Sequence, residues 1–139
     1  MTGSADTLTE AALALIEQPV IAHFATAGPD GWPQVTPVWV DHEGTDVLIN
    51  TAEGRVKPRF IRENPRVAIS LTAPNDPYNA LALRGTVVSI ATEGADEHID
   101  KLAKKYLGAD SYPMRTPGEV RVIVRVRPDR IVMQPAGSA

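Results

Sequence analysis

The chain has 139 residues, 43% of them hydrophobic and 22% charged, which suits one globular domain. Its net charge of −3 excludes a general attraction to nucleic acid or to an anionic membrane, and the absence of cysteine excludes disulfides and thiolate chemistry. The polar start, residues 1–6, lacks a signal peptide's apolar segment, and no apolar run is long enough to span a membrane. We therefore expect a cytoplasmic protein with one domain over residues 1–139 and an ordered core at about residues 8–133.

The first third of the chain predicts one helix and a hairpin-rich β-meander. Thr7 and Glu10 have the spacing of a capping box, and an apolar helical stripe follows. Strands are predicted over residues 20–26, 32–41 and 46–50, with turns at 28–31 and 41–44. Pro33 and Pro37 remove backbone donors from the second strand, which is therefore predicted to be irregular or at a sheet edge.

The remainder of the chain predicts three further strands and a clear amphipathic helix. The strands are expected over residues 66–72, 79–90 and 118–132, and the helix over residues 97–107. In the last strand the valines face one way, while Glu119, Arg121, Arg125 and Arg127 face the other, as a solvated face or a dimer surface. Short antiparallel strands at this spacing predict a mainly β (α+β) protein built as a closed or split barrel.

A short basic helix follows the third strand and is the most informative segment. Pro58 is tolerated only in a first helical turn, so the helix begins near Gly54 or Arg55, and Asn64-Pro65 ends it. Arg55 and Lys57 therefore lie at a helix N-terminus, where the helix dipole favours anions over cations. A bound phosphate-like anion would explain this arrangement. A solvated basic face is the alternative interpretation.

Ordinary catalytic groups are scarce in this sequence. His23, His42 and His98 lack metal-ligand spacing, and they are expected in a strand, in a turn and on the exposed side of a helix. No nucleophile elbow, P-loop or dinucleotide fingerprint is present. An anion site without catalytic machinery indicates that any chemistry belongs to a bound cofactor. Trp39 is expected in the core rather than stacked on a ligand ring.

The order of motifs resembles the split β-barrel superfamily of pyridoxamine 5'-phosphate oxidase-like proteins, and most closely its actinobacterial branch that uses the deazaflavin coenzyme F420. The resemblance covers about Leu8 to Met133. It is carried by Asp30-Gly31-Trp32-Pro33, Thr36-Pro37-Val38-Trp39, Asn50-Thr51, Gly54 to Arg59, Asn64-Pro65-Arg66-Val67, Tyr78, Arg84-Gly85, Lys105 to Gly108, Tyr112-Pro113 and Gly118 to Arg121.

This resemblance implies a six-stranded antiparallel split β-barrel of the FMN-binding type, with short flanking helices. It also implies a homodimer with two cofactor sites between the subunits. The cofactor phosphate would be held by Arg55 and Lys57, helped by Asn50-Thr51 and by the backbone of Gly54 and Val56. The strand at Thr36, Pro37 and Val38 would line the ring system. Tyr78 would come from the second subunit, and Arg59 would meet the acidic tail of F420.

The resemblance also bears on the choice of cofactor. Relatives that use flavin mononucleotide (FMN) carry an extra Arg and Lys on a strand that precedes the basic helix; in the matching region here, residues 34–40, there is no cation. F420 has a phosphodiester with one charge, which favours F420 over FMN. We therefore expect an F420-dependent reductase of a small unsaturated or heteroaromatic substrate, with no metal and no assignable catalytic residue. The alternatives are an FMN-dependent oxidoreductase of the same fold and a non-catalytic F420 carrier.

Overall fold

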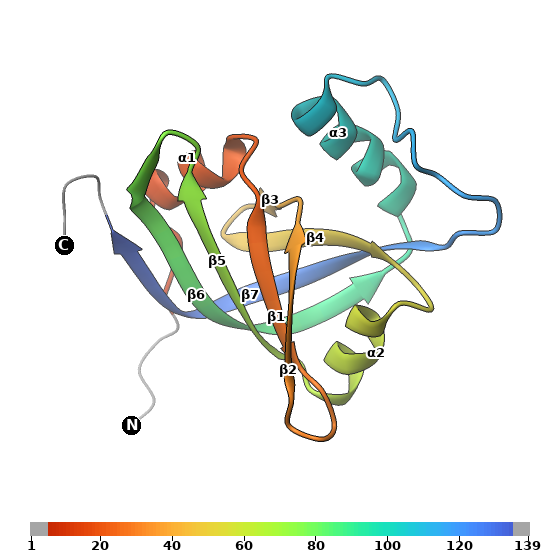
Figure 1. Ribbon diagram of the computed structural model, residues 1–139, viewed down its shortest axis with the longest axis horizontal. Coiled ribbons are helices and arrows are strands. Elements are labelled where there is room, and N and C mark those ends of the chain that lie inside the picture. The colour runs from red at the N-terminus through yellow and green to blue at the C-terminus, as the bar shows by residue number, and fades with distance from the viewer. Residues whose placement is uncertain (1–5, 135–139) are drawn as a thin grey trace.

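The structure, a computed structural model, describes residues 6–134, so residues 1–5 of the polar start lie outside the described residues, as do residues 135–139. Strands dominate, and helices flank them (Figure 1). In chain order the elements are α1 (Glu10–Glu17), β1 (Ala22–Ala27), β2 (Pro33–Val38), β3 (Asp41–Glu43), β4 (Asp46–Ala52), α2 (Val56–Glu63), β5 (Arg66–Ala73), β6 (Asp76–Ala91), α3 (Ala95–Leu107) and β7 (Arg121–Gln134).

The strands form one antiparallel sheet in the order β2-β1-β5-β6-β7-β4-β3. It has seven strands, so the prediction of six was wrong. The additional strand is β3, which was predicted as a turn because it is only three residues long and pairs with the strand that follows it. As predicted, the proline-containing β2 lies at an edge, where missing N–H donors cost no internal ladder bonds.

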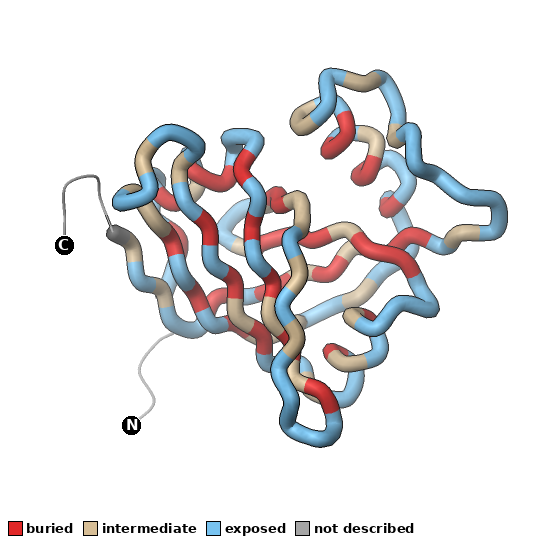
Figure 2. Tube along the Cα trace, in the orientation of Figure 1, coloured by how far each residue is buried: buried red, intermediate tan, exposed pale blue. Residues whose placement is uncertain are grey.

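The main hydrophobic core of the described residues is shared by strands from both halves of this sheet. Phe24 of β1 and Ile69 of β5 share it with Ile49 of β4 and Val124 of β7, although these strands lie in different parts of the sheet order. The sheet must therefore curve around the core. Buried residues alternate with more exposed ones along β1 and β5 (Figure 2), as expected where a sheet has one covered face, whereas β4 is buried along most of its length.

The first helix packs its apolar stripe onto this core, as predicted. Leu8, Ala12, Leu15 and Ile16 are all buried. The cap is Thr9 rather than the predicted Thr7, because the Thr9 hydroxyl accepts the Ala12 N–H at 3.2 Å and the helix begins at Glu10. In residues 6–134 no helix is both long enough and apolar enough to cross a membrane.

Candidate functional site: a cavity lined by cations and aromatic rings

A cavity of about 360 Å³ opens between the end of β2, the strand β4, the start of α2 and the helix α3. The loop that precedes β7 supplies its remaining wall. The lining residues are Ile21, Pro37, Val38, Trp39, Asn50, Thr51, Arg55, Lys57, Ile99, Tyr112, Met114 and Arg121. One part of the lining is apolar and aromatic, and the other is cationic, so the cavity suits a ligand with a ring system and an anionic group.

The cationic part is built on the start of α2, as the sequence predicted. Arg55 is the N-cap residue, and its side chain makes no capping hydrogen bond. The Arg55 side chain therefore does not accept a hydrogen bond from the first-turn N–H groups of α2. Gly54 has a φ of +83°, which lets the chain turn from β4 into the helix. An anion placed here would accept hydrogen bonds from the backbone N–H groups and would be stabilised by the helix dipole.

Three cations converge on this end of the cavity. Arg55 caps α2 and Lys57 lies in its first turn, while Arg121 is the first residue of β7. Burial lowers the pKa of Lys57, and the positive charges of Arg55 and Arg121 lower it further. Glu119 places a carboxylate beside them, 3.3 Å from Arg121 and 3.6 Å from Arg55. The cluster keeps an excess of positive charge, which an anionic ligand would neutralise.

Two buried polar atoms at the cavity lack hydrogen-bond partners among the described residues. The Thr51 hydroxyl is one, on a residue that is only 1% exposed, and Nη1 of Arg121 is the other. Such atoms are rare in proteins because an unsatisfied buried donor costs about 1–3 kcal/mol. A phosphate oxygen beside either atom would accept a hydrogen bond from it. The residues present therefore fit the phosphate of the implied cofactor.

Arg121 was predicted on a solvated face or a dimer surface; the solvated face is wrong, and the dimer surface stays a prediction. Its side chain is only 3% exposed, its Nε donates to Asn50 Oδ1 at 2.9 Å, and its guanidinium lies 5.1 Å from the ring centroid of Tyr112. The loop before β7 covers this residue, whereas Arg127 further along the strand is exposed. No local signal in the sequence separates Arg121 from the other arginines of the strand.

The aromatic part of the cavity is organised around Trp39. Its ring stacks on Tyr106, with centroids 5.0 Å apart and planes inclined by 6°, and meets the edge of Tyr112 at 6.0 Å. The Tyr106 hydroxyl donates to Val20 O and accepts the Val40 N–H, which fixes the ring. Trp39 is half-buried and lines the cavity, so it is not the core residue that we expected.

The structure brings together six of the predicted cofactor-binding residues. Pro37, Val38, Asn50, Thr51, Arg55 and Lys57 line the cavity. The other five do not line it in the monomer. Thr36 is half-buried on β2, Gly54 and Val56 flank Arg55, Arg59 lies 5.3 Å from the Phe60 ring, and Tyr78 is 63% exposed at the start of β6. The sequence reasoning missed Ile21, Ile99, Tyr112 and Met114, which reach the cavity only through tertiary packing.

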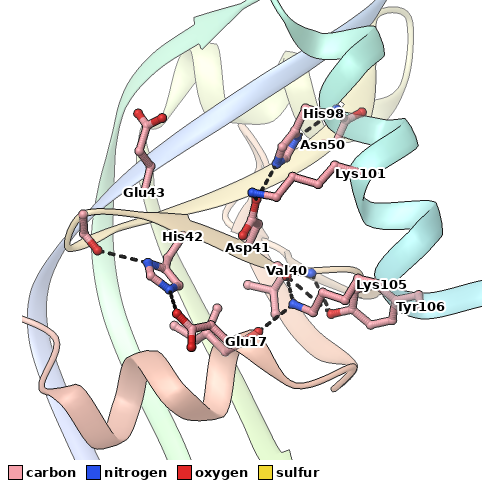
Figure 3. A network of polar contacts seen from close by, with 12 residues as sticks. Glu17, Val40, Asp41, His42, Glu43, Asn50, His98, Lys101, Lys105 and Tyr106 are labelled. Atoms are coloured by element: carbon pink, nitrogen blue, oxygen red, sulfur yellow. Dashed lines mark hydrogen bonds and ion pairs between the residues drawn. The ribbon is translucent and has the colours of Figure 1, made fainter. Parts of the chain in front are cut away.

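His98 is buried, so the prediction of an exposed histidine on α3 was wrong. Its Nε2 lies 3.0 Å from Asp41 Oδ2 on β3, and its Nδ1 lies 3.1 Å from Asn50 Nδ2 on β4 (Figure 3). The polar face of the helix covers these two polar side chains, which helical periodicity by itself does not reveal. No group of three His, Asp or Glu residues within the described range could hold a metal ion.

Comparison with known proteins gives the family. The family model described as pyridoxamine 5'-phosphate oxidase matches residues 8–134. The chain therefore belongs to the pyridoxamine 5'-phosphate oxidase-like family, as the motifs indicated. No curated protein matches the chain.

Solved structures agree with this assignment. One named F420 reductase is 34% identical, with a TM-score of 0.79, over 91% of this chain and all of its own. A conserved hypothetical protein from Mycobacterium tuberculosis is 20% identical, with a TM-score of 0.71, over 97% of this chain and 89% of its own. General Stress Protein 26 from Bacillus anthracis is 20% identical, with a TM-score of 0.68, over 90% of this chain and 92% of its own. The last two show the fold alone.

Proposed function

We propose that this protein is an F420-dependent oxidoreductase that reduces a small unsaturated or heteroaromatic substrate. The observation that carries the proposal is a cavity that three cations and an aromatic wall share with the buried Thr51 hydroxyl, which has no hydrogen-bond partner among residues 6–134. Membership of the oxidase-like family supports an oxidoreductase of this fold. The 34% identity to a structure named F420 reductase supports the deazaflavin as the cofactor.

The roles of the individual residues follow from their positions around the cavity. Arg55, Lys57 and the Thr51 hydroxyl would bind the cofactor phosphate together with the N–H groups at the start of α2. Pro37 and Val38 of β2 would support the ring system. Arg59, one helical turn further along α2, is our candidate for binding the acidic tail of F420. Thr36 is our candidate for contact with the cofactor ring system.

The chemistry requires little of the protein beyond binding and orientation. Reduced F420, when bound, supplies a hydride. The protein would hold the ring and the substrate in a fixed geometry and exclude water with the apolar side chains of Ile21, Ile99 and Met114. We assign no proton donor, since solvent can protonate the product.

We also propose that the protein acts as a homodimer, with each cofactor site between the subunits. The outer face of the sheet carries small and apolar side chains next to two exposed arginines, Arg84 and Arg130, and Val35 and Val132 are each 60% exposed there. Ala25, Ala68 and Ala82 lie between them and would let a second sheet approach closely. In such a dimer the exposed Tyr78 would reach the partner's cavity.

An FMN-dependent oxidoreductase is the second candidate, and Arg121 is the observation that favours it. F420 was favoured over FMN because residues 34–40, on and just after β2, contain no cation. Arg121 adds a third cation from a strand distant in sequence, although Glu119 compensates one positive charge. The cation count therefore does not separate a phosphomonoester from a phosphodiester.

Titration of the purified protein with F420 and with FMN, followed by fluorescence, tests the proposal. We expect tight binding of F420, weaker binding of FMN, and oxidation of reduced F420 in the presence of suitable unsaturated compounds. Arg55→Ala and Lys57→Ala should each weaken binding by about 1–3 kcal/mol, whereas Lys104→Ala on the exposed face of α3 should not. Preference for FMN, or binding without turnover of reduced F420, would contradict the proposal.

A further inference from the structure

A chain of hydrogen bonds connects the anion site to a buried carboxylate on the far side of β4. Arg121 Nε donates to Asn50 Oδ1 at 2.9 Å, and Asn50 Nδ2 lies 3.1 Å from His98 Nδ1. His98 Nε2 lies 3.0 Å from Asp41 Oδ2. The side chains of Asp41, His98 and Asn50 lie in a row between the sheet and α3 (Figure 3). The order is therefore Asp41, His98, Asn50, Arg121.

The donors and acceptors along this chain follow from its two ends. Arginine has no acceptor, so the Asn50 oxygen must face Arg121 and the Asn50 amide nitrogen must face His98. That nitrogen donates to Ala95 O at 2.9 Å and to His98 Nδ1. His98 Nδ1 must then be unprotonated, and Nε2 carries the proton that it donates to Asp41.

The Asp41 carboxylate is suited to hold this tautomer. Burial raises its pKa, but hydrogen bonds from His98 and from the His42 backbone, together with the charge of Lys101, outweigh burial and hold the pKa well below its usual value. Asp41 and His98 are each less than a tenth exposed, so water competes little for these bonds. The carboxylate therefore remains an acceptor throughout the neutral range.

We propose that His98 is a positioning residue of the anion site, which orients Asn50 so that Asn50 Oδ1 holds Arg121 against the ligand's anionic group. Without an acceptor at His98 Nδ1, only the bond to Ala95 O opposes a turn of the Asn50 amide that would bring its nitrogen toward Arg121, where two donors would face each other. Nη1 of Arg121, which has no hydrogen-bond partner among the described residues, would then lose its place at the ligand. The inference rests on the proposed function, because it takes the ligand's anionic group to be the cofactor phosphate.

Two near-isosteric substitutions separate positioning from simple packing. In His98→Asn the side-chain oxygen takes the place of Nδ1 and still accepts from Asn50, whereas contact with Asp41 is lost. In His98→Gln the amide nitrogen takes the place of Nε2 and still donates to Asp41, whereas the acceptor for Asn50 is lost. We expect F420 affinity to stay within about threefold of wild type in His98→Asn and to fall roughly tenfold in His98→Gln.

A double-mutant cycle shows whether the effect passes through Arg121. In an Arg121→Ala background, His98→Gln should weaken F420 binding no further. Equal losses in His98→Asn and His98→Gln would overturn the inference, as would no loss in either, or a full further loss in the Arg121→Ala background. Thermal melts of each variant establish that it is folded before its affinity is interpreted.

A measurement on the wild-type protein is independent of both folding defects and the cofactor. Nitrogen NMR of the ¹⁵N-histidine-labelled protein should show His98 with Nδ1 unprotonated and Nε2 protonated at neutral pH. A proton on Nδ1 would overturn the inference even if F420 binds. If neither F420 nor FMN binds, the proposed function fails, and the same NMR experiment still decides the state of His98.

Discussion

The Glu119 carboxylate lies 3.3 Å from the Arg121 guanidinium, and both side chains are buried. Oε1 of Glu119 and Nη1 of Arg121 nevertheless form no well-aligned hydrogen bond. Glu119 also lies 3.6 Å from Arg55. It is therefore a built-in counterion that an anionic ligand must compete with for the same two arginines.

Removal of this counterion should strengthen anion binding. We expect Glu119→Gln to bind F420 about tenfold more tightly, the effect of roughly 1.4 kcal/mol from one nearby like charge. The measurement is a fluorescence titration at constant ionic strength. Glu63→Gln, at the exposed far end of α2, removes the same charge and serves as the control. Weaker binding by Glu119→Gln would mean instead that Glu119 holds the arginines in place.

The affinity for the anion should depend on the protonation of Lys57. Burial, Arg55 and Arg121 lower the pKa of Lys57, and a bound anion favours its charged form. Binding should therefore be strongest below this pKa and should weaken as the pH rises through it, before ordinary lysines titrate. Titrations with F420 across the alkaline range should show this loss. Lys57→Arg keeps its charge there, so a loss of the same size in that variant would contradict the assignment.

Asp41 should stabilise the fold in a pH-dependent way. Its pKa in the folded protein lies below the ordinary value of 3.8, so its contribution is present above that value and is lost as the pH falls through the folded pKa. We expect Asp41→Asn to cost about 1–3 kcal/mol of unfolding free energy near neutral pH and less in acid. Urea unfolding of the wild type and the variant, near neutral pH and in acid, measures this difference in unfolding free energy. Asp110→Asn, at an exposed position, should cost almost nothing.

The proposed dimer can be disrupted at its centre. Ala68 lies on β5 between the exposed apolar side chains of the outer sheet face. Ala68→Arg would place a long charged side chain between the two sheets, and we expect a monomer in size-exclusion chromatography with light scattering. The same variant should lose cofactor affinity, since in the proposed dimer each site would lie between the subunits. Ala11→Arg, on the exposed side of α1, should remain dimeric. A dimeric Ala68→Arg would exclude this face as the interface.

The sequence by itself determined the elements that have local signals. The basic helix was predicted from Gly54, Pro58 and the Asn64-Pro65 stop, because backbone conformation at glycine and proline depends on near neighbours. The edge position of β2 followed from its two prolines in the same way. The matching family model agrees with the ordered motifs that indicated the family. These motifs were recognisable without knowledge of which strands pair.

Only the tertiary structure decided what completes the site. Arg121 meets Asn50 across 71 positions of sequence, and His98 meets Asp41 across 57. The alternating pattern of β7 predicted an exposed Arg121, because alternation describes one strand and says nothing of a loop that covers it. Charge and burial at such positions arise from strand pairing and helix packing, which bring distant segments together. Arg55 and Lys57 of the proposed anion site could therefore be predicted from the sequence, whereas its third cation, Arg121, and its counterion, Glu119, could not.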